Sequence, residues 1–292
     1  FYITIAIQII GVIMFYFLWN SKDLGNNHSL FFNSIFQSIS SFNGAGFDII
    51  SDKNGGSIGS ISQNINILYS ISFLVFLGSI GYPIILEFIV NFKLFLQSKF
   101  RNIYISLNFK VVISTTIFMI LFGAFQFMLS EWSNAHTIGK ESYENKIIIS
   151  FFHSFNRTSG FSLIDYNLIH NSTSITTMIL MFVGGGSLSV SGGIKVGTLA
   201  VIFAALISNI LGKEEITIFK RTLSKEATRR ALIIFIFSIF VIIFSFMIIS
   251  AFEPDTIFRE LLFECVSAFG NVGLTTGITN ELNDISKIFI IF

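Results

Sequence analysis

Long runs of apolar residues dominate the chain, and short polar stretches separate them. A helix that crosses a bilayer takes about 20 consecutive apolar residues, and several runs reach that length. They cover 1–19, 65–92, 109–130, 175–210 and 230–252, and a further run begins near residue 285. The pattern predicts an all-α membrane protein that lies in a lipid bilayer.

Three shorter apolar stretches lie between these runs, at 30–42, 147–156 and 257–269. Each is too short to cross the bilayer but suits a helix that enters half of it. Each is followed by a string rich in glycine and then by another long run. The sequence therefore predicts a repeated unit of span, short re-entrant helix, non-helical loop and span. The expected units are 1–92, 93–212 with a broken inner span, and 213–292 with a truncated last span.

The three loops share one register. They read "SSFNGAGFD" at 40–48, "SFNRTSGFS" at 154–162 and "SAFGNVGLTTG" at 267–277. In each, a serine precedes a glycine by the same offset, in the pairs Ser40 and Gly46, Ser154 and Gly160, Ser267 and Gly273. The glycines are almost evenly spaced along the chain. Chance similarity between loops would not reproduce the spacing, the flanking helices and the serine offset together.

Composition excludes several other classes of protein. With 52% hydrophobic and 12% charged residues, the chain is not a water-soluble globular domain. A single cysteine, Cys265, allows no intramolecular disulfide and no cysteine metal cluster. A net charge of +1 without a basic tract predicts no nucleic-acid partner. The start at Phe1 lacks the features of a signal peptide, so we expect both ends to be truncated.

The distribution of charge predicts an orientation, because cytoplasmic loops carry an excess of Lys and Arg. The connections after the second and fourth runs hold three acids, Glu214, Glu215 and Glu226. They hold many more basic residues, namely Lys93, Lys99, Arg101, Lys110, Lys213, Lys220, Arg221, Lys225, Arg229 and Arg230. We expect these connections on the cytoplasmic side.

The opposite side is acidic, and all three glycine loops fall on it. Its basic residues are Lys22, Lys53, Lys140, Lys146, Arg259 and Lys287. Its acids are Asp23, Asp48, Asp52, Glu131, Glu141, Glu144, Asp165, Glu253, Asp255, Glu260, Glu264, Glu281 and Asp284. A negative vestibule would concentrate cations, although ordinary solvated loops explain the charges equally well.

Non-helical backbone at membrane depth is tolerated only where it is buried or lines a watery cavity. Backbone carbonyls that replace the hydration shell of a cation give such loops a purpose. Glycine permits the required backbone angles, and a short helix entering from outside aims its negative C-terminal end at the membrane centre. The candidate carbonyl ligands are Gly44, Ala45, Gly46, Phe47, Thr158, Ser159, Gly160, Phe161, Asn271, Val272, Gly273 and Leu274.

A second feature breaks the run 175–210. The segment "GGGSLSVSGGIK" at 184–195 holds five glycines and three serines, too many for a stable helix. A phosphate-binding loop does not fit, because Ile194 separates Gly193 from Lys195. Close helix packing by small residues is the alternative to a functional loop.

Two basic side chains, Arg157 and Lys195, fall within the expected membrane region, where a charge is costly unless it is paired or functional. We expect Arg157 to brace the neighbouring loop by pairing with Glu264, or otherwise with Glu260 or Asp165. Lys195 either extends to the interface or sets an electrostatic barrier. The histidines lack the spacing of metal ligands and suit surface or packing roles: His28, His136, His153 and His170.

The motifs "NGAGF" (43–47), "RTSGF" (157–161) and "NVGLTTG" (271–277) resemble the second, third and fourth filter loops of the Trk/Ktr/HKT potassium transporter family. The bacterial Ktr type is the closest. The resemblance implies four non-identical units around one pore, so a first unit and the final span would be missing here. It also implies potassium uptake, with a gate formed by the intramembrane loop. The gate residues would be Gly184, Gly185, Gly186, Ser187, Ser189, Ser191, Gly192, Gly193 and Lys195.

The same resemblance implies partners and a location. Ktr-type subunits form homodimers with one pore per protomer, on a cytoplasmic ring of nucleotide-binding regulatory subunits. The expected location is a bacterial cytoplasmic membrane, and sodium remains open as a coupling or modulating ion. The alternative function is a membrane-embedded enzyme that acts on a lipid phosphate at the serine–glycine loop. An enzyme would need converging acid, base or nucleophile residues, and the sequence shows no such set.

Overall fold

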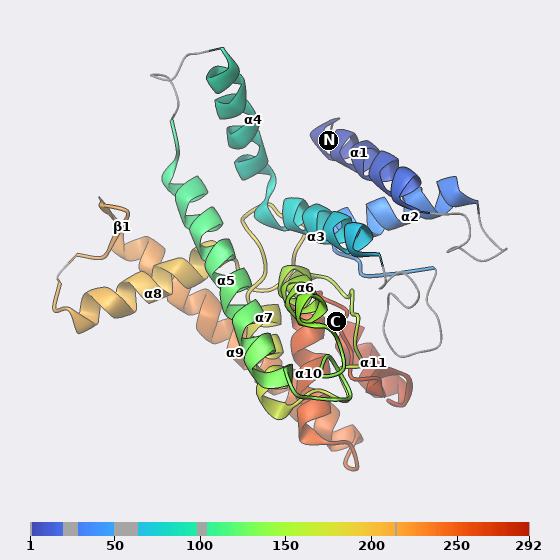
Figure 1. The fold of residues 1–292 in the computed structure, drawn as a ribbon. Coiled ribbons are helices and arrows are strands. Elements are labelled where there is room, and N and C mark those ends of the chain that lie inside the picture. The colour runs from blue at the N-terminus through green and yellow to red at the C-terminus, as the bar shows by residue number, and fades with distance from the viewer. Residues whose placement is uncertain (1, 20–28, 50–63, 98–103, 214, 292) are drawn as a thin grey trace.

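The computed structural model describes residues 2–19, 29–49, 64–97, 104–213 and 215–291 (Figure 1). Several charged or titratable residues used above to predict orientation and histidine roles lie outside this part of the chain. They are Lys22, Asp23, His28, Asp52, Lys53, Lys99, Arg101 and Glu214.

The described part is helical except for loops and one small hairpin. The long and short helices are α1 (Tyr2–Leu18), α2 (Leu30–Asn43), α3 (Ile65–Ile80), α4 (Tyr82–Leu96), α5 (Leu107–Glu131), α6 (Tyr143–Phe155), α7 (Asn171–Phe182), α8 (Val196–Ile210), α9 (Lys225–Phe252), α10 (Phe258–Phe269) and α11 (Asp284–Ile291). Two 3-10 turns, η3 (Asn156–Thr158) and η4 (Ile278–Asn280), follow α6 and precede α11. Strands β1 (Thr217–Ile218) and β2 (Arg221–Thr222) pair antiparallel between α8 and α9.

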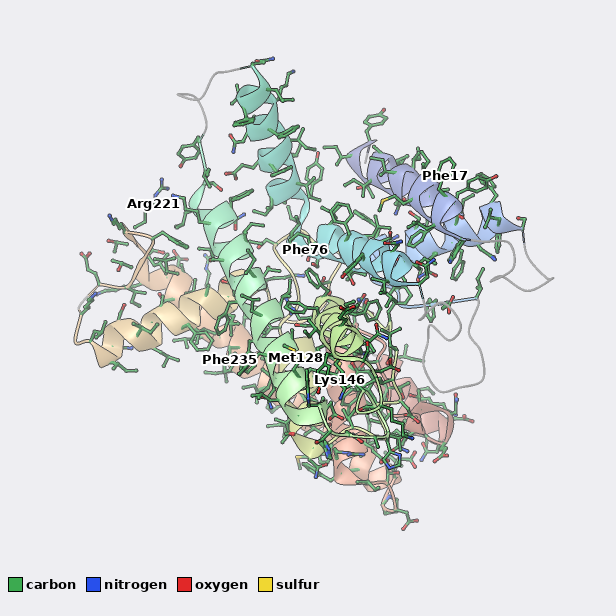
Figure 2. All side chains as sticks on the ribbon, viewed as in Figure 1. Phe17, Phe76, Met128, Lys146, Arg221 and Phe235 are labelled. Carbon is green, nitrogen blue, oxygen red and sulfur yellow. The ribbon has the colours of Figure 1, made fainter. Side chains whose placement is uncertain are left out.

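Two helices in the described part, α5 and α9, are each long and apolar enough to cross a membrane. They match the predicted runs 109–130 and 230–252. The bent pair α3 and α4 gives a third crossing if it is counted as one span. Many large apolar side chains point outward from these helices, as Figure 2 shows for Phe17 on α1, which is 80% exposed. Outward apolar side chains suit a chain whose solvent is lipid.

The prediction of one continuous span over 65–92 is wrong. Helix α3 ends at Ile80, and α4 begins at Tyr82 after a bend of 102°. Gly81 between them has φ +89° and ψ 148°, a conformation that only glycine adopts readily. Pro83 lies two residues after Gly81, and a proline in the first turn of a helix disfavours helix before it. The bend turns α4 out of the line of α3, and Glu87 of α4 accepts hydrogen bonds from the N–H and hydroxyl of Ser106, the N-cap of α5 (Figure 1).

The run 175–210 is broken, as the sequence predicts. Helix α7 ends at Phe182, α8 starts at Val196, and residues 183–195 between them form irregular backbone. Its two ends are joined, because the Gly184 N–H donates to the Ile194 carbonyl at 2.8 Å and the Ile194 N–H donates to the Phe182 carbonyl at 3.0 Å. The loop is therefore a closed protrusion from the helix axis.

The short helices α2, α6 and α10 correspond to the predicted re-entrant helices. Two of them dock on their preceding span in the same way. In α2, the Ser38 hydroxyl donates to the Gln8 carbonyl of α1 at 2.7 Å, beside Gly11. In α6, the Ser154 hydroxyl donates to the Ile120 carbonyl of α5 at 2.6 Å, beside Gly123. In both cases a glycine three residues after the carbonyl makes room for the serine, although Ser38 and Ser154 differ by two positions in the register set by Gly46 and Gly160.

Candidate functional site

The three aligned glycines meet at one place. A Cβ added to Gly46 would lie 2.3 Å from the Cα of Gly160, and one added to Gly160 would lie 3.2 Å from the carbonyl of Gly273. From Gly273, an added Cβ would lie 3.7 Å from the Cα of Gly160 and 3.9 Å from the Ala45 carbonyl oxygen. Backbones this close leave no room for side chains between the loops. The structure thus brings one glycine from each predicted unit into a common cluster.

The first loop turns sharply after α2. Gly44 caps the helix in the left-handed region at φ +64°, and its N–H donates to the carbonyls of Ser40 and Ser41. Gly46 is also left-handed, at φ +71°. The Ser40 hydroxyl donates to the Phe47 carbonyl at 2.7 Å, which holds the end of the loop against its helix. Ala45 and Phe47 are exposed, so the loop surface is open on that side.

The second loop is buried throughout. Thr158, Ser159, Gly160 and Phe161 follow the turn η3, and all four are buried. The Ser159 hydroxyl donates to the side-chain oxygen of Asn156 at 3.0 Å. This hydrogen bond ties the loop to the turn η3 that precedes it.

Asn156 is a support residue that the sequence interpretation missed. Its amide nitrogen donates to the Ser72 hydroxyl of α3 at 3.3 Å and to the Phe152 carbonyl at 2.9 Å. It therefore ties the loop of one unit to the inner helix of the preceding one. Its position directly before Arg157 was the available signal.

The third loop is extended and alternates between exposed and buried residues. Asn271, Gly273 and Thr275 are exposed, whereas Val272 and Leu274 are buried. Asn271 and Gly273 have positive φ, +49° and +89°. A cavity of about 510 Å³ opens beside this loop. Extended backbone beside open space is the arrangement that can present carbonyl oxygens to an ion.

Glu264 supports this third loop directly. Its carboxylate accepts hydrogen bonds from the Thr275 hydroxyl, from the Thr276 N–H at 3.2 Å and from the Thr279 hydroxyl at 2.9 Å. Glu264 lies on α10, so the carboxylate links the short helix to the chain that follows the loop.

The predicted pairing of Arg157 with Glu264 is wrong, and Glu260 and Asp165 do not replace it. No ion pair involves Arg157 among the described residues. Its guanidinium is buried and donates to three backbone carbonyls, those of Leu180, Val183 and Gly184. The carbonyls at the C-terminal end of a helix carry partial negative charge, so the end of α7 replaces the carboxylate. Arg157 therefore connects the second glycine loop to the start of the segment 184–195.

That segment also contacts the third loop. A Cβ added to Gly192 would lie 2.4 Å from the carbonyl oxygen of Gly270. Gly270 is the C-cap of α10 and directly precedes Asn271. On its other side, the Gly186 N–H donates to the Ser79 carbonyl at 2.7 Å and the Val190 N–H to the Gly78 carbonyl at 3.3 Å. The Tyr82 N–H donates to the Leu188 carbonyl at 3.3 Å. The segment 184–195 thus lies between the third glycine loop and the bend at Gly81.

The remaining predicted gate residues differ in exposure. Gly184, Gly185, Gly186 and Ser191 are buried, Ser187 is exposed, and Ser189, Gly192, Gly193 and Lys195 are intermediate. The Lys195 ammonium donates to the Ser191 carbonyl at 2.5 Å. Ser187 and Lys195 line a cavity of about 770 Å³ that continues between α5, α8 and α9. Lys195 therefore has a partner in its own loop while facing this space.

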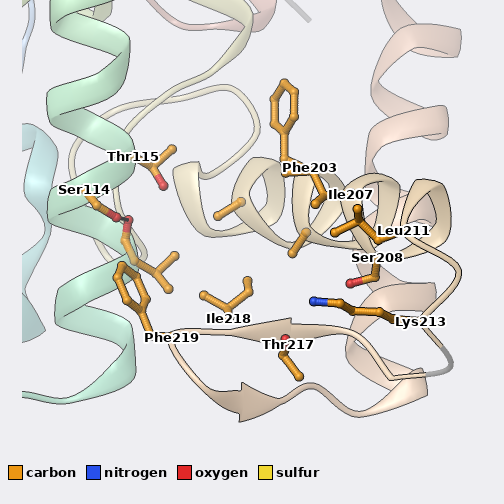
Figure 3. A pocket seen from close by; sticks show the side chains of 13 residues that line it. Ser114, Thr115, Phe203, Ile207, Ser208, Leu211, Lys213, Thr217, Ile218 and Phe219 are labelled. Atoms are coloured by element: carbon orange, nitrogen blue, oxygen red, sulfur yellow. Dashed lines mark hydrogen bonds between the residues drawn. The ribbon is translucent and has the colours of Figure 1, made fainter.

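A further cavity of about 310 Å³ lies between α5, α8 and the hairpin, and sequence reasoning did not foresee it. Figure 3 shows Ser208 and Lys213 on one side of it and Ser114, Ile218 and Phe219 on the other. The hairpin residues that close it come from a polar connection without a periodic pattern. Only their fold against α8 creates the space.

Two buried titratable side chains, His153 and Cys265, lie among apolar neighbours. Buried His153 has its Nδ1 2.9 Å from the Tyr166 hydroxyl and stacks on Phe127. Cys265 is a free, buried thiol. In the described ranges, no group of three or more His, Cys, Asp or Glu could hold a metal ion.

Short helices that end in glycine loops, with those loops meeting inside a shell of apolar helices, define a pore-loop cation transport protein of the membrane. Residues 1–292 match TrkH, a family of cation transport proteins, and the chain belongs to that family. It is a multi-pass membrane protein. The predicted fold class and family resemblance are both confirmed.

Relatives with curated names are also cation transport proteins. The chain is 32% identical to the Ktr system potassium uptake protein B of Bacillus subtilis over 263 residues, which cover 89% of this chain and 56% of that protein. It is 32% identical to the potassium/sodium uptake protein NtpJ of Enterococcus hirae, over 99% of this chain and 61% of that protein. The chain therefore spans somewhat over half the length of these relatives.

The fold matches a solved structure. The crystal structure of the potassium transporter TrkH from Vibrio parahaemolyticus superposes with a TM-score of 0.72 and 15% identity, over 99% of this chain and 59% of that chain. The family and the named relatives are transport proteins and not enzymes, which removes the alternative of an enzyme acting on lipid phosphate.

Proposed function

We propose that the complete protein takes up potassium ions through a filter of backbone carbonyls. The filter would consist of residues 44–47, 158–161 and 271–274, with one glycine of each stretch at its centre. The observation that carries the proposal is the meeting of Gly46, Gly160 and Gly273 at contact distance. The relatives named as potassium uptake proteins support the choice of ion.

The electrostatics of the site favour a cation without a carboxylate ligand. The helices α2, α6 and α10 each end at the filter, so their negative C-terminal ends point toward it. The two charged neighbours are engaged elsewhere, since Arg157 bonds to the end of α7 and Glu264 to the threonines behind the third loop. Both residues serve in this proposal as filter supports.

The segment 184–195 would act as the gate. It lies against Gly270 at the base of the third filter loop, and its Ser187 and Lys195 face the 770 Å³ cavity on the other side. Small residues let such a loop shift without displacing packed side chains. We therefore assign it to the ion path between the filter and the cytoplasm.

The proposed assembly and location follow the family. They comprise a homodimer with one pore per protomer, a cytoplasmic ring of nucleotide-binding regulatory subunits, and a bacterial cytoplasmic membrane. The units 1–92, 93–212 and 213–292 remain our proposed division of the chain. Sodium is a second candidate ion because one relative is named for potassium and sodium uptake.

The test is ion uptake by the complete protein in liposomes. A rubidium tracer should enter vesicles that contain the protein and not protein-free vesicles, and external potassium should compete more strongly than sodium. Sodium added without potassium would show whether it is also carried. Vesicles that contain folded protein and take up no rubidium under any ionic condition would contradict the proposal.

A further inference from the structure

An apolar groove runs along the outer surface where α7, α8, α9 and α10 come together. Its volume is about 440 Å³, within the ~300–1,000 Å³ range of ligand pockets. All its lining side chains are apolar: Ile175, Met178, Ile179, Phe182, Val183, Leu199, Phe235, Ile239, Ile242, Ile243, Leu262 and Val266. Figure 2 marks Phe235 on this side of α9. The groove offers no side chain that could bind a polar headgroup.

The position of the groove along α9 indicates which part of the bilayer it faces. Its α9 residues run from Phe235 to Ile243, and Ile239 lies at the middle of the 28-residue helix. At 1.5 Å per residue, these positions lie within about 6 Å of the helix centre. The hydrocarbon core of a bilayer is about 30 Å thick, so the groove faces acyl chains rather than headgroups or water. Its rim is open, because Ile175, Ile179 and Ile243 are each at least half exposed.

The floor of the groove belongs to the functional site. The Phe182 ring lies 5.7 Å from the ring of Phe269, stacked on the last residue of α10 before the third filter loop. It also lies 5.8 Å from Phe235, edge to face. The neighbouring Val183 carbonyl accepts a hydrogen bond from Arg157, and Gly184 starts the segment 184–195. Whatever fills the groove therefore contacts the residues that join filter and gate.

We propose that this groove binds one acyl chain of a bilayer lipid, which holds Phe182 and Val183 in place. In lipid, an acyl chain gains no free energy from leaving water, so binding comes from packing against a surface of matching shape. A flexible chain fills such an irregular apolar groove without leaving a polar group unsatisfied. Binding itself does not depend on the proposed function, but its effect on potassium uptake does.

The direct test is a cryo-EM structure of the complete protein in phospholipid nanodiscs. We expect an elongated density between α7 and α9 at the level of Ile239. An empty groove would overturn the proposal. So would protein density there, either from a second copy or from another part of the same protein.

A matched pair of variants tests binding in solution. Ile243→Trp fills the groove from α9, whereas Ile233→Trp changes an equally exposed isoleucine of α9 that does not line it. Native mass spectrometry with added phosphatidylglycerol should show affinity for one phospholipid about tenfold lower in Ile243→Trp, because the indole ring takes up the space in which the acyl chain would pack. Ile233→Trp should bind like the wild type.

Potassium uptake separates the two proposals. Uptake should fall in Ile243→Trp and not in Ile233→Trp if the bound chain supports the site. Equal lipid affinity and equal uptake in both variants would overturn the lipid site and leave the proposed function standing. A wild-type protein that retains the lipid but carries no potassium would contradict only the proposed function.

Discussion

Gly46 and Gly160 approach so closely that a Cβ on Gly46 would lie 2.3 Å from both the Cα and the nitrogen of Gly160. The two residues lie in different units and more than a hundred positions apart in sequence. Real Cβ contacts are essentially never shorter than 3.0 Å, so the two loops can meet only if residue 46 is glycine. The shared position of Gly46 and Gly160 in their loops therefore has a steric cause, because the loops could not meet with a larger residue at position 46.

The first prediction compares alanine at these two positions. Gly46→Ala adds the clash to a left-handed backbone at φ +71°, whereas alanine at Gly160 meets its nearest atoms at 3.2 Å, which a small shift can relieve. We expect Gly46→Ala to abolish potassium uptake and Gly160→Ala to reduce uptake and its preference over sodium. Competition assays in liposomes measure both. Equal effects of the two variants would contradict a filter centred on this contact.

A second prediction concerns Arg157. Arg157→Gln removes the charge and leaves at least one of its three carbonyl acceptors without a donor. Hydrogen bonds to a charged group contribute roughly 1.5–3 kcal/mol each, so the melting temperature should fall clearly. Arg157→Lys keeps the positive charge but lacks the planar guanidinium. Its melting temperature should lie between those of the wild type and Arg157→Gln.

The measurements are thermal unfolding in detergent and rubidium uptake. Glu260→Gln is a useful comparison, because the sequence suggested that carboxylate as a partner and the structure shows no bond between it and Arg157. If Glu260→Gln reproduced the loss seen in Arg157→Gln, the backbone assignment would be wrong.

The helices and loops were predictable because lipid imposes strong patterns. A long apolar run and a glycine string leave few choices of secondary structure at membrane depth. The partner of Arg157 was not predictable in this way, since a backbone carbonyl has no sequence signature. Glu264 was the expected partner because it is a carboxylate on the next short helix of the sequence. In the structure, its carboxylate instead accepts hydrogen bonds from Thr275 and Thr279.

The bend at Gly81 was missed for a different reason. The residues around it are apolar, so hydropathy over 65–92 shows no interruption. The available signal was local, a glycine two residues before Pro83, which marks a break even inside an apolar run. Hydrophobicity predicted the membrane location correctly, but backbone chemistry decided the direction of the chain.

A third prediction follows from that bend. Gly81→Ala places a side chain at φ +89° and 2.3 Å from the Ser187 carbonyl oxygen in the proposed gate segment. A strained residue of this kind costs of order 1–3 kcal/mol, so we expect lower stability and altered gating. Gly197→Ala is the matched control, because nothing lies within 4 Å of an added Cβ there. Single-channel or flux recordings at fixed potassium should change in the first variant and not in the second.

The last prediction tests the segment 184–193 as a gate. If it lies across the ion path, deleting several of its glycines and serines in the complete protein should raise potassium flux. It should also weaken the dependence of flux on the proposed nucleotide-binding partner, because regulation would need only a shift of α8 to move the loop. A deletion that spares Gly186 and Val190 keeps their N–H bonds to the Ser79 and Gly78 carbonyls, so the shortened segment stays attached to α3. Unchanged flux in a well-folded deletion variant would mean that the segment is only a packing break in the helix.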